Sequence, residues 1–188
     1  MAIKTNHRVR PEQRQHGAAA VEFGLIAIVF FTLLLGIIEF GRVLYLWNTV
    51  QEVTRRAARE AVVRDFSATQ VDTIQRAAIF RAGSTGTVKL PAGGEITNLR
   101  VNIRYLNAAG NEADPMPSDP ADNIAACLDS DRVNSCIRFV EASVCQQQGN
   151  SCGPVQYVPM VGLFPFLAIN IPVSTVVMPA ESLGFRVD

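Results

Sequence analysis

A single carboxylate interrupts the most apolar stretch of the chain. Glu22 is the only charged residue between Ala18 and Ile38, and it follows Gly17 by five positions. Because a charged side chain in the middle of a bilayer costs roughly 2.5–3.5 kcal/mol on insertion scales, it needs a compensating cation. Cleavage after Gly17 would give Ala18 a free ammonium one helical turn from Glu22, or from the Glu22 of a neighbouring copy. A cut at this position would therefore supply the cation that Glu22 needs.

The second set of residues that could do chemistry consists of four cysteines, Cys127, Cys136, Cys145 and Cys152. They follow the apolar stretch, on the side that we expect to be exported, where an even number of cysteines usually forms disulfides. Of the three possible connectivities we favour the local one, Cys127 with Cys136 and Cys145 with Cys152, because each pair closes a short loop. Zinc is the alternative, but the chain has no CxxC pair, and both histidines, His7 and His16, precede Gly17.

Other chemistry finds little support in the sequence. Without residues 1–17 the chain has no histidine, which removes histidine-based nucleophile pairs and metal sites. No phosphate-binding glycine loop or dinucleotide-binding motif occurs. We therefore expect no enzymatic activity, no cofactor and no resident metal.

An acidic segment could bind calcium; its acids are Glu112, Asp114, Asp119, Asp122, Asp129 and Asp131. Its spacing lacks the glycine and the glutamate of an EF-hand, so a solvated loop is the simpler interpretation.

The apolar stretch itself predicts a membrane span. Residues 18–38 would rise about 30 Å as a helix, which matches one bilayer core. Residues 1–16 carry four basic side chains against Glu12 alone, so the N-terminus is expected to stay cytoplasmic. Since no signal-peptidase pattern interrupts the run downstream, we expect the span to remain attached. Nucleic-acid binding is disfavoured, because the only basic cluster precedes the span.

Helical periodicity continues beyond the span. No proline interrupts residues 18–65, and apolar or small residues recur every three or four positions, which predicts one helix of about 45 residues. Glu39 and Arg42, three positions apart at the outer membrane boundary, are expected to pair, either as interfacial charges or as a subunit contact. The expected inward face consists of Val43, Trp47, Val50, Thr54, Ala57 and Ala61.

The remainder predicts a small α+β domain. A second helix is expected over residues 68–82, with a capping box formed by Ser67 and Gln70. Strands are expected at 101–105, 137–144, 155–158 and 168–177, with Pro172 forcing the last to an edge or bulge, and residues 107–123 as an exposed loop. Residues 159–166 are apolar but too interrupted by proline and glycine to span a membrane. There, Phe164, Pro165 and Phe166 belong either to the core or to a partner contact.

Two runs carry a resemblance to a known family. Gly17-Ala18-Ala19-Ala20-Val21-Glu22-Phe23, followed by Gly36-Ile37-Ile38-Glu39-Phe40-Gly41-Arg42, resembles the TadE-like minor pseudopilins of tight-adherence (Tad/Flp) pilus systems. The resemblance covers about residues 14–65, with a weaker echo near residues 174–181. It implies a leader peptide at 1–17, a transmembrane and spine helix at 18–65, and a pilin-like periplasmic α+β domain with disulfide-bonded loops at 66–188.

The resemblance also implies roles for individual residues. Gly17, Ala18 and Glu22 match the processing signature, with cleavage by a prepilin peptidase between the first two. Subunit packing is expected to involve Glu22, Phe23, Gly24, Gly36, Glu39, Gly41 and Arg42.

Partners and location follow from the same resemblance. The implied partners are the prepilin peptidase, other minor pseudopilins, the major Flp-type pilin, an inner-membrane assembly platform and the lipid bilayer. The implied location is the bacterial inner membrane, single-pass, with a cytoplasmic N-terminus and a periplasmic C-terminal domain; whether the protein enters the extracellular pilus stays open. The alternatives are an unprocessed, membrane-anchored periplasmic binding domain and an exported adhesin domain that acts through its loops.

Overall fold

The computed structural model describes residues 16–148, 151–163 and 165–185. These fall into two compact units, one ending at Ile38 and one beginning at Glu39. Most of the predicted leader, residues 1–15, lies outside the described residues, and so does Phe164 of the apolar tract. The boundaries at residues 17 and 65 concern processing and membrane crossing, and they stay predictions.

Helix α1, His16–Val63, is the single long helix that the sequence predicted. In the first unit its apolar side chains are almost all exposed, and the helix is long and apolar enough to cross a membrane by length and composition. In the second unit one face is buried, because apolar and small residues recur there at helical spacing. Trp47, expected on this face, is 38% exposed; the buried residues are Val43, Leu46, Val50, Val53, Thr54, Ala57, Ala58, Ala61 and Val62.

Helix α2, Ala68–Ala78, is shorter than the predicted 68–82. It ends because Phe80 adopts a left-handed backbone conformation with φ of 62°. The predicted capping box is wrong: Ser67 occupies the N-cap position but its side chain makes no capping hydrogen bond. Instead, the Ser67 backbone N–H donates to Asp65 Oδ1 at 3.0 Å.

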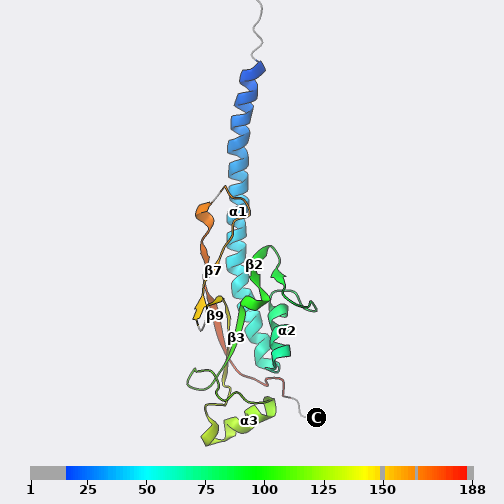
Figure 1. Ribbon diagram of the computed structural model, residues 1–188, viewed down its shortest axis with the longest axis vertical. Helices are drawn as coiled ribbons and strands as arrows, with labels where there is room; N and C mark the ends of the chain where they lie inside the picture. The colour runs from blue at the N-terminus through cyan, green and yellow to red at the C-terminus, as the bar shows by residue number, and fades with distance from the viewer. Residues whose placement is uncertain (1–15, 149–150, 164, 186–188) are drawn as a thin grey trace, which may run out of the picture. The chain divides into compact units, whose positions relative to one another are not determined.

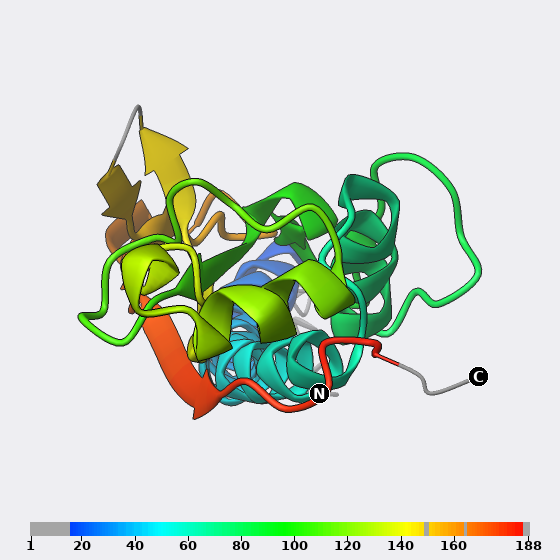
Figure 2. The same ribbon diagram turned by 90° about the horizontal axis from the view of Figure 1, so that it is seen from below.

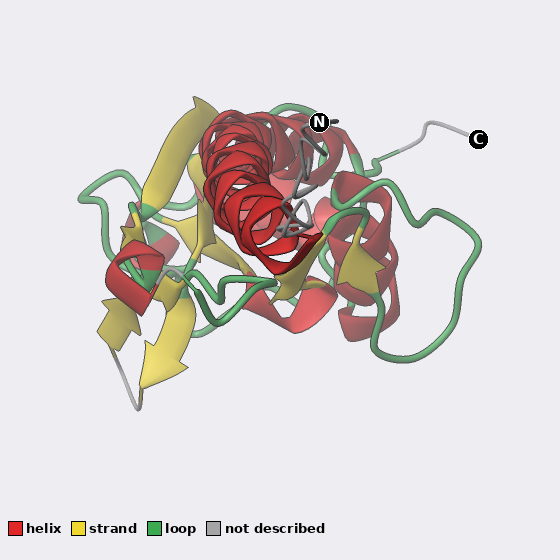
Figure 3. Cartoon of the chain, turned by 90° about the horizontal axis from the view of Figure 1, so that it is seen from above, coloured by secondary structure: helices red, strands yellow, loops and turns green. Residues whose placement is uncertain are grey.

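Three antiparallel strands form the main sheet, in the order β3 (Val101–Leu106), β4 (Phe139–Val144) and β9 (Ser174–Pro179). The second-unit segment of α1 packs against one face of this sheet, and α2 lies beside β3, where Gln75 donates a hydrogen bond to the Val101 carbonyl at 2.8 Å (Figures 1 and 3). Alternation along the strands turns Val140, Ala142 and Val144 to the core. The opposite face is polar, with Arg104 directly across from Glu141.

Three two-stranded pairs complete the β-structure of the described residues. They are β1 (Lys89–Leu90) with β2 (Gly93–Thr97), β5 (Gln146–Gln148) with β6 (Ser151–Gly153), and β7 (Val155–Gln156) with β8 (Asn170–Ile171). The expected strand at 168–177 is wrong as one strand, because it divides at Pro172: β8 pairs with β7, and β9 pairs with β4. Short 3₁₀ helices lie at Asn98–Arg100, Ser130–Arg132 and Pro165–Leu167.

Helix α3, Pro120–Leu128, occupies part of the segment expected to be a loop (Figure 2). Asp119 is its N-cap, and Oδ1 of that side chain accepts a hydrogen bond from the Asp122 backbone N–H at 2.8 Å. Pro120 stands at the first helical position, where its missing N–H costs no intrahelical bond. The loop prediction is therefore wrong from residue 120 on, although the α+β class with disulfide-bonded loops is confirmed.

The packing of α1 against the β1–β2 hairpin requires a glycine. A Cβ at Gly93 would lie 2.3 Å from Cδ2 of Leu46, and Leu46 is fully buried. The neighbouring Gly94 has open space, with Lys89 Cδ the nearest atom at 3.9 Å. Of these two glycines, only Gly93 lies where the hairpin backbone comes close to the helix.

We expect Gly93→Ala to lower the free energy of unfolding by about 1–3 kcal/mol, because the added methyl group overpacks the Leu46 site. Denaturant unfolding of the full chain in detergent, followed by circular dichroism, measures the change. Gly94→Ala is the matched control and should unfold near the wild-type midpoint. Equal midpoints for the two variants would contradict this account of the packing.

Candidate functional site

The predicted processing residues lie in the first two turns of α1. Gly17, Ala18 and Glu22 are all exposed. Glu22 has no hydrogen-bond or ion-pair partner among the described residues, although it stands in a run of apolar side chains. Phe23 is also exposed, and a Cβ at Gly24 would meet nothing within 4 Å. This part of the helix can accept contacts from outside the chain, as both processing and subunit packing require.

Glu39, predicted to pack against other subunits, has partners within the chain. Its side chain is only 1% exposed. Its Oε1 accepts a hydrogen bond from the Tyr157 hydroxyl at 2.9 Å and another from the Met160 backbone N–H at 2.6 Å. A buried carboxylate with charged or polar donors avoids most of the cost of an unpaired charge. Glu39 therefore fixes the segment after β7 to α1.

Arg42 extends this cluster to the β1–β2 hairpin. Its guanidinium donates to Glu95 Oε1 at 2.5 Å, to the Ala92 carbonyl at 3.0 Å and to the Val158 carbonyl at 2.9 Å. It lies 3.9 Å from Glu39 Oε1, which confirms the predicted pairing, and 4.8 Å from the centroid of the Tyr157 ring. One arginine thus joins α1, the hairpin and the segment that follows β7.

The protonation states suit this arrangement. Burial, together with the hydrogen bond to Glu39, raises the pKa of the Tyr157 hydroxyl to about 12, although Arg42 opposes the shift. Burial lowers the pKa of Arg42, but the hydrogen bond and charge of Glu95 outweigh it and raise the pKa above its usual value. Tyr157 therefore stays a proton donor, and Arg42 stays a cation, at neutral pH.

The two remaining glycines predicted to pack against other subunits, Gly36 and Gly41, differ in their surroundings. A Cβ at Gly41 would meet nothing within 4 Å, and Gly36 is half-buried. The sequence did not indicate Tyr157 or Glu95, since neither belongs to a recognisable motif. The one signal that could have pointed to such partners is general: a Glu and an Arg three positions apart, if buried, require polar partners from elsewhere in the chain.

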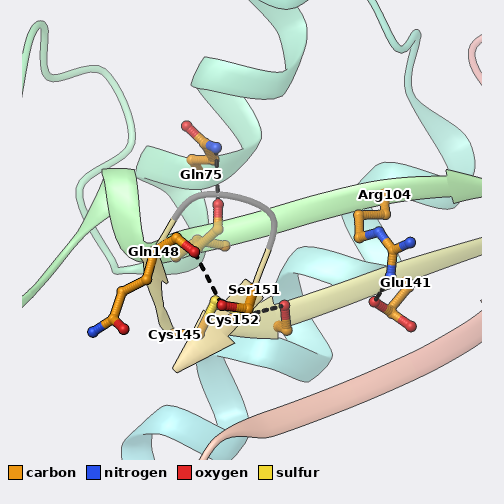
Figure 4. The surroundings of a disulfide bond; sticks show 9 residues. Gln75, Arg104, Glu141, Cys145, Gln148, Ser151 and Cys152 are labelled. Atoms are coloured by element: carbon orange, nitrogen blue, oxygen red, sulfur yellow. Dashed lines mark hydrogen bonds and ion pairs between the residues drawn. A yellow bond between two sulfur atoms is a disulfide. The ribbon is translucent and has the colours of Figure 1, made fainter. Parts of the chain in front are cut away.

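The disulfides follow the local connectivity that the spacing favoured, Cys127 with Cys136 and Cys145 with Cys152. The second closes the β5–β6 hairpin beside the polar face of the sheet (Figure 4). There a groove of about 660 Å³ opens, whose lining includes Asn102, Ser143, Gln147 and Thr175. Arg104 also lines this groove, and its guanidinium forms ion pairs with Glu112 Oε1 at 2.7 Å and with Glu141 Oε1 at 3.0 Å.

The acidic segment does not gather into a metal site. Among the described residues, no group of three or more His, Cys, Asp and Glu side chains is placed to hold a metal ion. Asp119 and Asp129 accept hydrogen bonds at the starts of α3 and the following 3₁₀ helix, and Asp122 pairs with Arg132 at 2.8 Å. These carboxylates have local structural roles.

We expect Glu39→Ala to lower the free energy of unfolding by about 2–5 kcal/mol, because it removes the carboxylate that accepts from the buried Tyr157 hydroxyl and from the part-buried Met160 N–H. Denaturant unfolding of the full chain in detergent measures the loss. Glu52→Ala, a change at an exposed glutamate of the same helix, is the matched control and should have little effect. Similar midpoints for both variants would show that the cluster adds no stability.

Comparison with known families agrees with the N-terminal motifs. Residues 17–59, all within α1, match the family model of TadE-like proteins. No curated protein and no solved structure matches the chain. The match confirms the resemblance expected from the two runs at residues 17–23 and 36–42, and the family suggests involvement in Tad pilus systems. Over residues 17–59, the chain is similar to TadE-like proteins.

Proposed function

We propose that the chain is a minor pseudopilin precursor with a structural, non-catalytic role in assembling a Tad/Flp-type adhesive pilus. The observation that carries this proposal is Glu22, an exposed carboxylate without a partner among the described residues, in an apolar helix five positions after Gly17. The family match supports the proposal, since it begins at Gly17, the residue before the expected cut.

The proposed mechanism starts with orientation in the membrane. The basic leader keeps residues 1–17 in the cytoplasm while the apolar part of α1 inserts into the inner membrane. A prepilin peptidase then hydrolyses the peptide bond between Gly17 and Ala18. The new α-amine has an ordinary pKa of about 8, so it is largely protonated at neutral pH.

The amine then becomes the partner that Glu22 lacks. When processed helices pack side by side, the ammonium of Ala18 on one subunit neutralises Glu22 on its neighbour. An unpaired charge in an apolar bundle is expensive, so a shifted axial register would be disfavoured. Glu22 would thus specify how subunits align, in contacts with other minor pseudopilins and the major pilin.

The second unit fits an initiator, tip or platform component better than a repeating shaft subunit. Residues 39–188 form a domain with its own core and two disulfides, which suits the oxidising periplasm. Such a bulky domain would have to be accommodated at every step of a filament if this protein formed the shaft.

We expect Gly17→Ala to abolish processing, because the peptidase requires glycine before the cut. Intact mass and N-terminal sequencing of the membrane-extracted protein, from cells with and without the peptidase, measure the result. The wild type should begin at Ala18 only when the peptidase is present. Gly41→Ala changes another glycine of α1 with open surroundings, and this control should be processed normally. A wild-type chain that keeps Met1 in both strains would contradict the proposal.

We expect Glu22→Ala to be processed largely as wild type but to be defective in assembly, because the new amine loses its partner. The amount of pilus sheared from cells, together with the mature N-terminus, separates these two steps. Glu52→Ala removes an exposed carboxylate of the same helix outside the apolar segment, and should assemble normally. Normal piliation by Glu22→Ala would argue against the amine–carboxylate mechanism.

A membrane-anchored binding domain is the second candidate function. The polar groove between the β5–β6 hairpin and the sheet favours it, since hydrogen-bonding side chains converge there. An unprocessed Met1 start in the presence of the peptidase would support this function over the first.

A further inference from the structure

One exposed apolar segment of the second unit has no role in the proposed function. The chain leaves the core after β7, forms an excursion of about a dozen residues and returns through β8. Its base is fixed: Tyr157 is buried, and its backbone N–H donates to the Ile169 carbonyl at 2.9 Å. We call residues 158–163 the apolar loop.

The apolar loop exposes side chains that a soluble surface would normally cover. Met160 is 72% exposed and Leu163 is 60% exposed, and Val158 is also exposed. No charged residue occurs anywhere between Glu141 and Glu181. Contiguous exposed apolar side chains of this kind mark a surface that contacts a partner or a membrane.

The contacts of the apolar loop hold it to the first residues of α1 in the second unit. The Met160 N–H donates to Glu39 Oε1 at 2.6 Å, and the Val158 carbonyl accepts from Arg42 at 2.9 Å. Glu39 directly follows the span predicted at residues 18–38. The loop backbone is therefore held within one side-chain length of the residue where α1 leaves the hydrocarbon, and the polar interface there is only about 5–7 Å thick.

Neighbouring side chains match an interfacial position. Tyr45 and Trp47 are half-exposed on α1, within about two turns of Glu39, and such amphipathic rings are enriched at membrane interfaces. Lys89, which is exposed, lines the pocket beside Met160, where a cation can meet lipid phosphates. Apolar side chains flanked by aromatic rings and cations are typical of segments that dip into a bilayer surface.

We propose that the apolar loop inserts into the outer interface of the bilayer that α1 spans, so that the domain contacts the membrane at a second point before assembly. Val158, Met160 and Leu163 are the inserting side chains, and lipid acyl chains are the partner. The inference rests on the membrane insertion of α1 in the proposed function, but not on cleavage or pilus assembly.

Tryptophan quenching by brominated phospholipids in vesicles that contain the full chain tests this inference. In a Trp47→Phe background, Leu163→Trp reports on the apolar loop and Phe30→Trp reports on the span. Leu128→Trp is the matched control, because Leu128 is 85% exposed on α3. We expect strong quenching at position 163 by bromines near the lipid carbonyls, strong quenching at position 30 by bromines deeper in the chains, and little at position 128.

Three other outcomes would overturn the inference. Weak quenching at 163, equal to that at 128, with normal quenching at 30 would mean that α1 inserts but the loop does not. Protection of position 163 from both brominated lipid and aqueous iodide would mean that protein covers it. Absence of quenching at position 30 would overturn membrane insertion itself, and the proposed function with it. Met160→Trp repeats the measurement at a second loop position, with circular dichroism as the check on folding.

Discussion

The buried carboxylate of Glu39 is the contact on which the membrane-proximal part of the domain depends. It accepts hydrogen bonds from the Tyr157 hydroxyl and the Met160 N–H, while Arg42, one turn later, donates to Glu95 and to two backbone carbonyls. Two segments far apart in sequence, the β1–β2 hairpin and the segment after β7, are thereby joined to the first two turns of α1 in the second unit. Since charges removed from water require partners, neither segment can shift without exposing or orphaning a charged group.

Two glutamates of α1, Glu22 and Glu39, meet this requirement in different ways. Glu39 finds its donors within the chain, whereas Glu22 has none among the described residues. The same residue type in one helix can therefore serve the domain in one case and an external partner in the other. The second run, around Glu39, stabilises the domain, and under the proposed function the first run, around Glu22, would join subunits.

Local sequence patterns predicted most of the elements, whereas contacts between residues far apart in the sequence could not be predicted. Spacing alone indicated α1, strands β3 and β4, the local disulfides and the pairing of Glu39 with Arg42. The Tyr157 partner lies 118 positions from Glu39, and no periodicity connects the two. Helix α3 was missed even though Asp119 and Pro120 are good start signals, because the surrounding prolines and acids indicated a loop. The Ser67 side chain makes no capping hydrogen bond, and its backbone N–H, which Gln70 would accept in a capping box, donates to Asp65.

The position of the two disulfides has a mechanical consequence. Each joins cysteines fewer than ten residues apart, and neither involves α1. Apart from the backbone that continues from Val63 into α2, a pull applied along the helix would reach the sheet through non-covalent contacts: the apolar face from Val43 to Val62 and the cluster around Arg42. The disulfides would keep two surface loops intact under tension, but they would not stop the helix from losing its packing against the sheet. Resistance to that separation is set by packing and desolvated charge rather than by the disulfides.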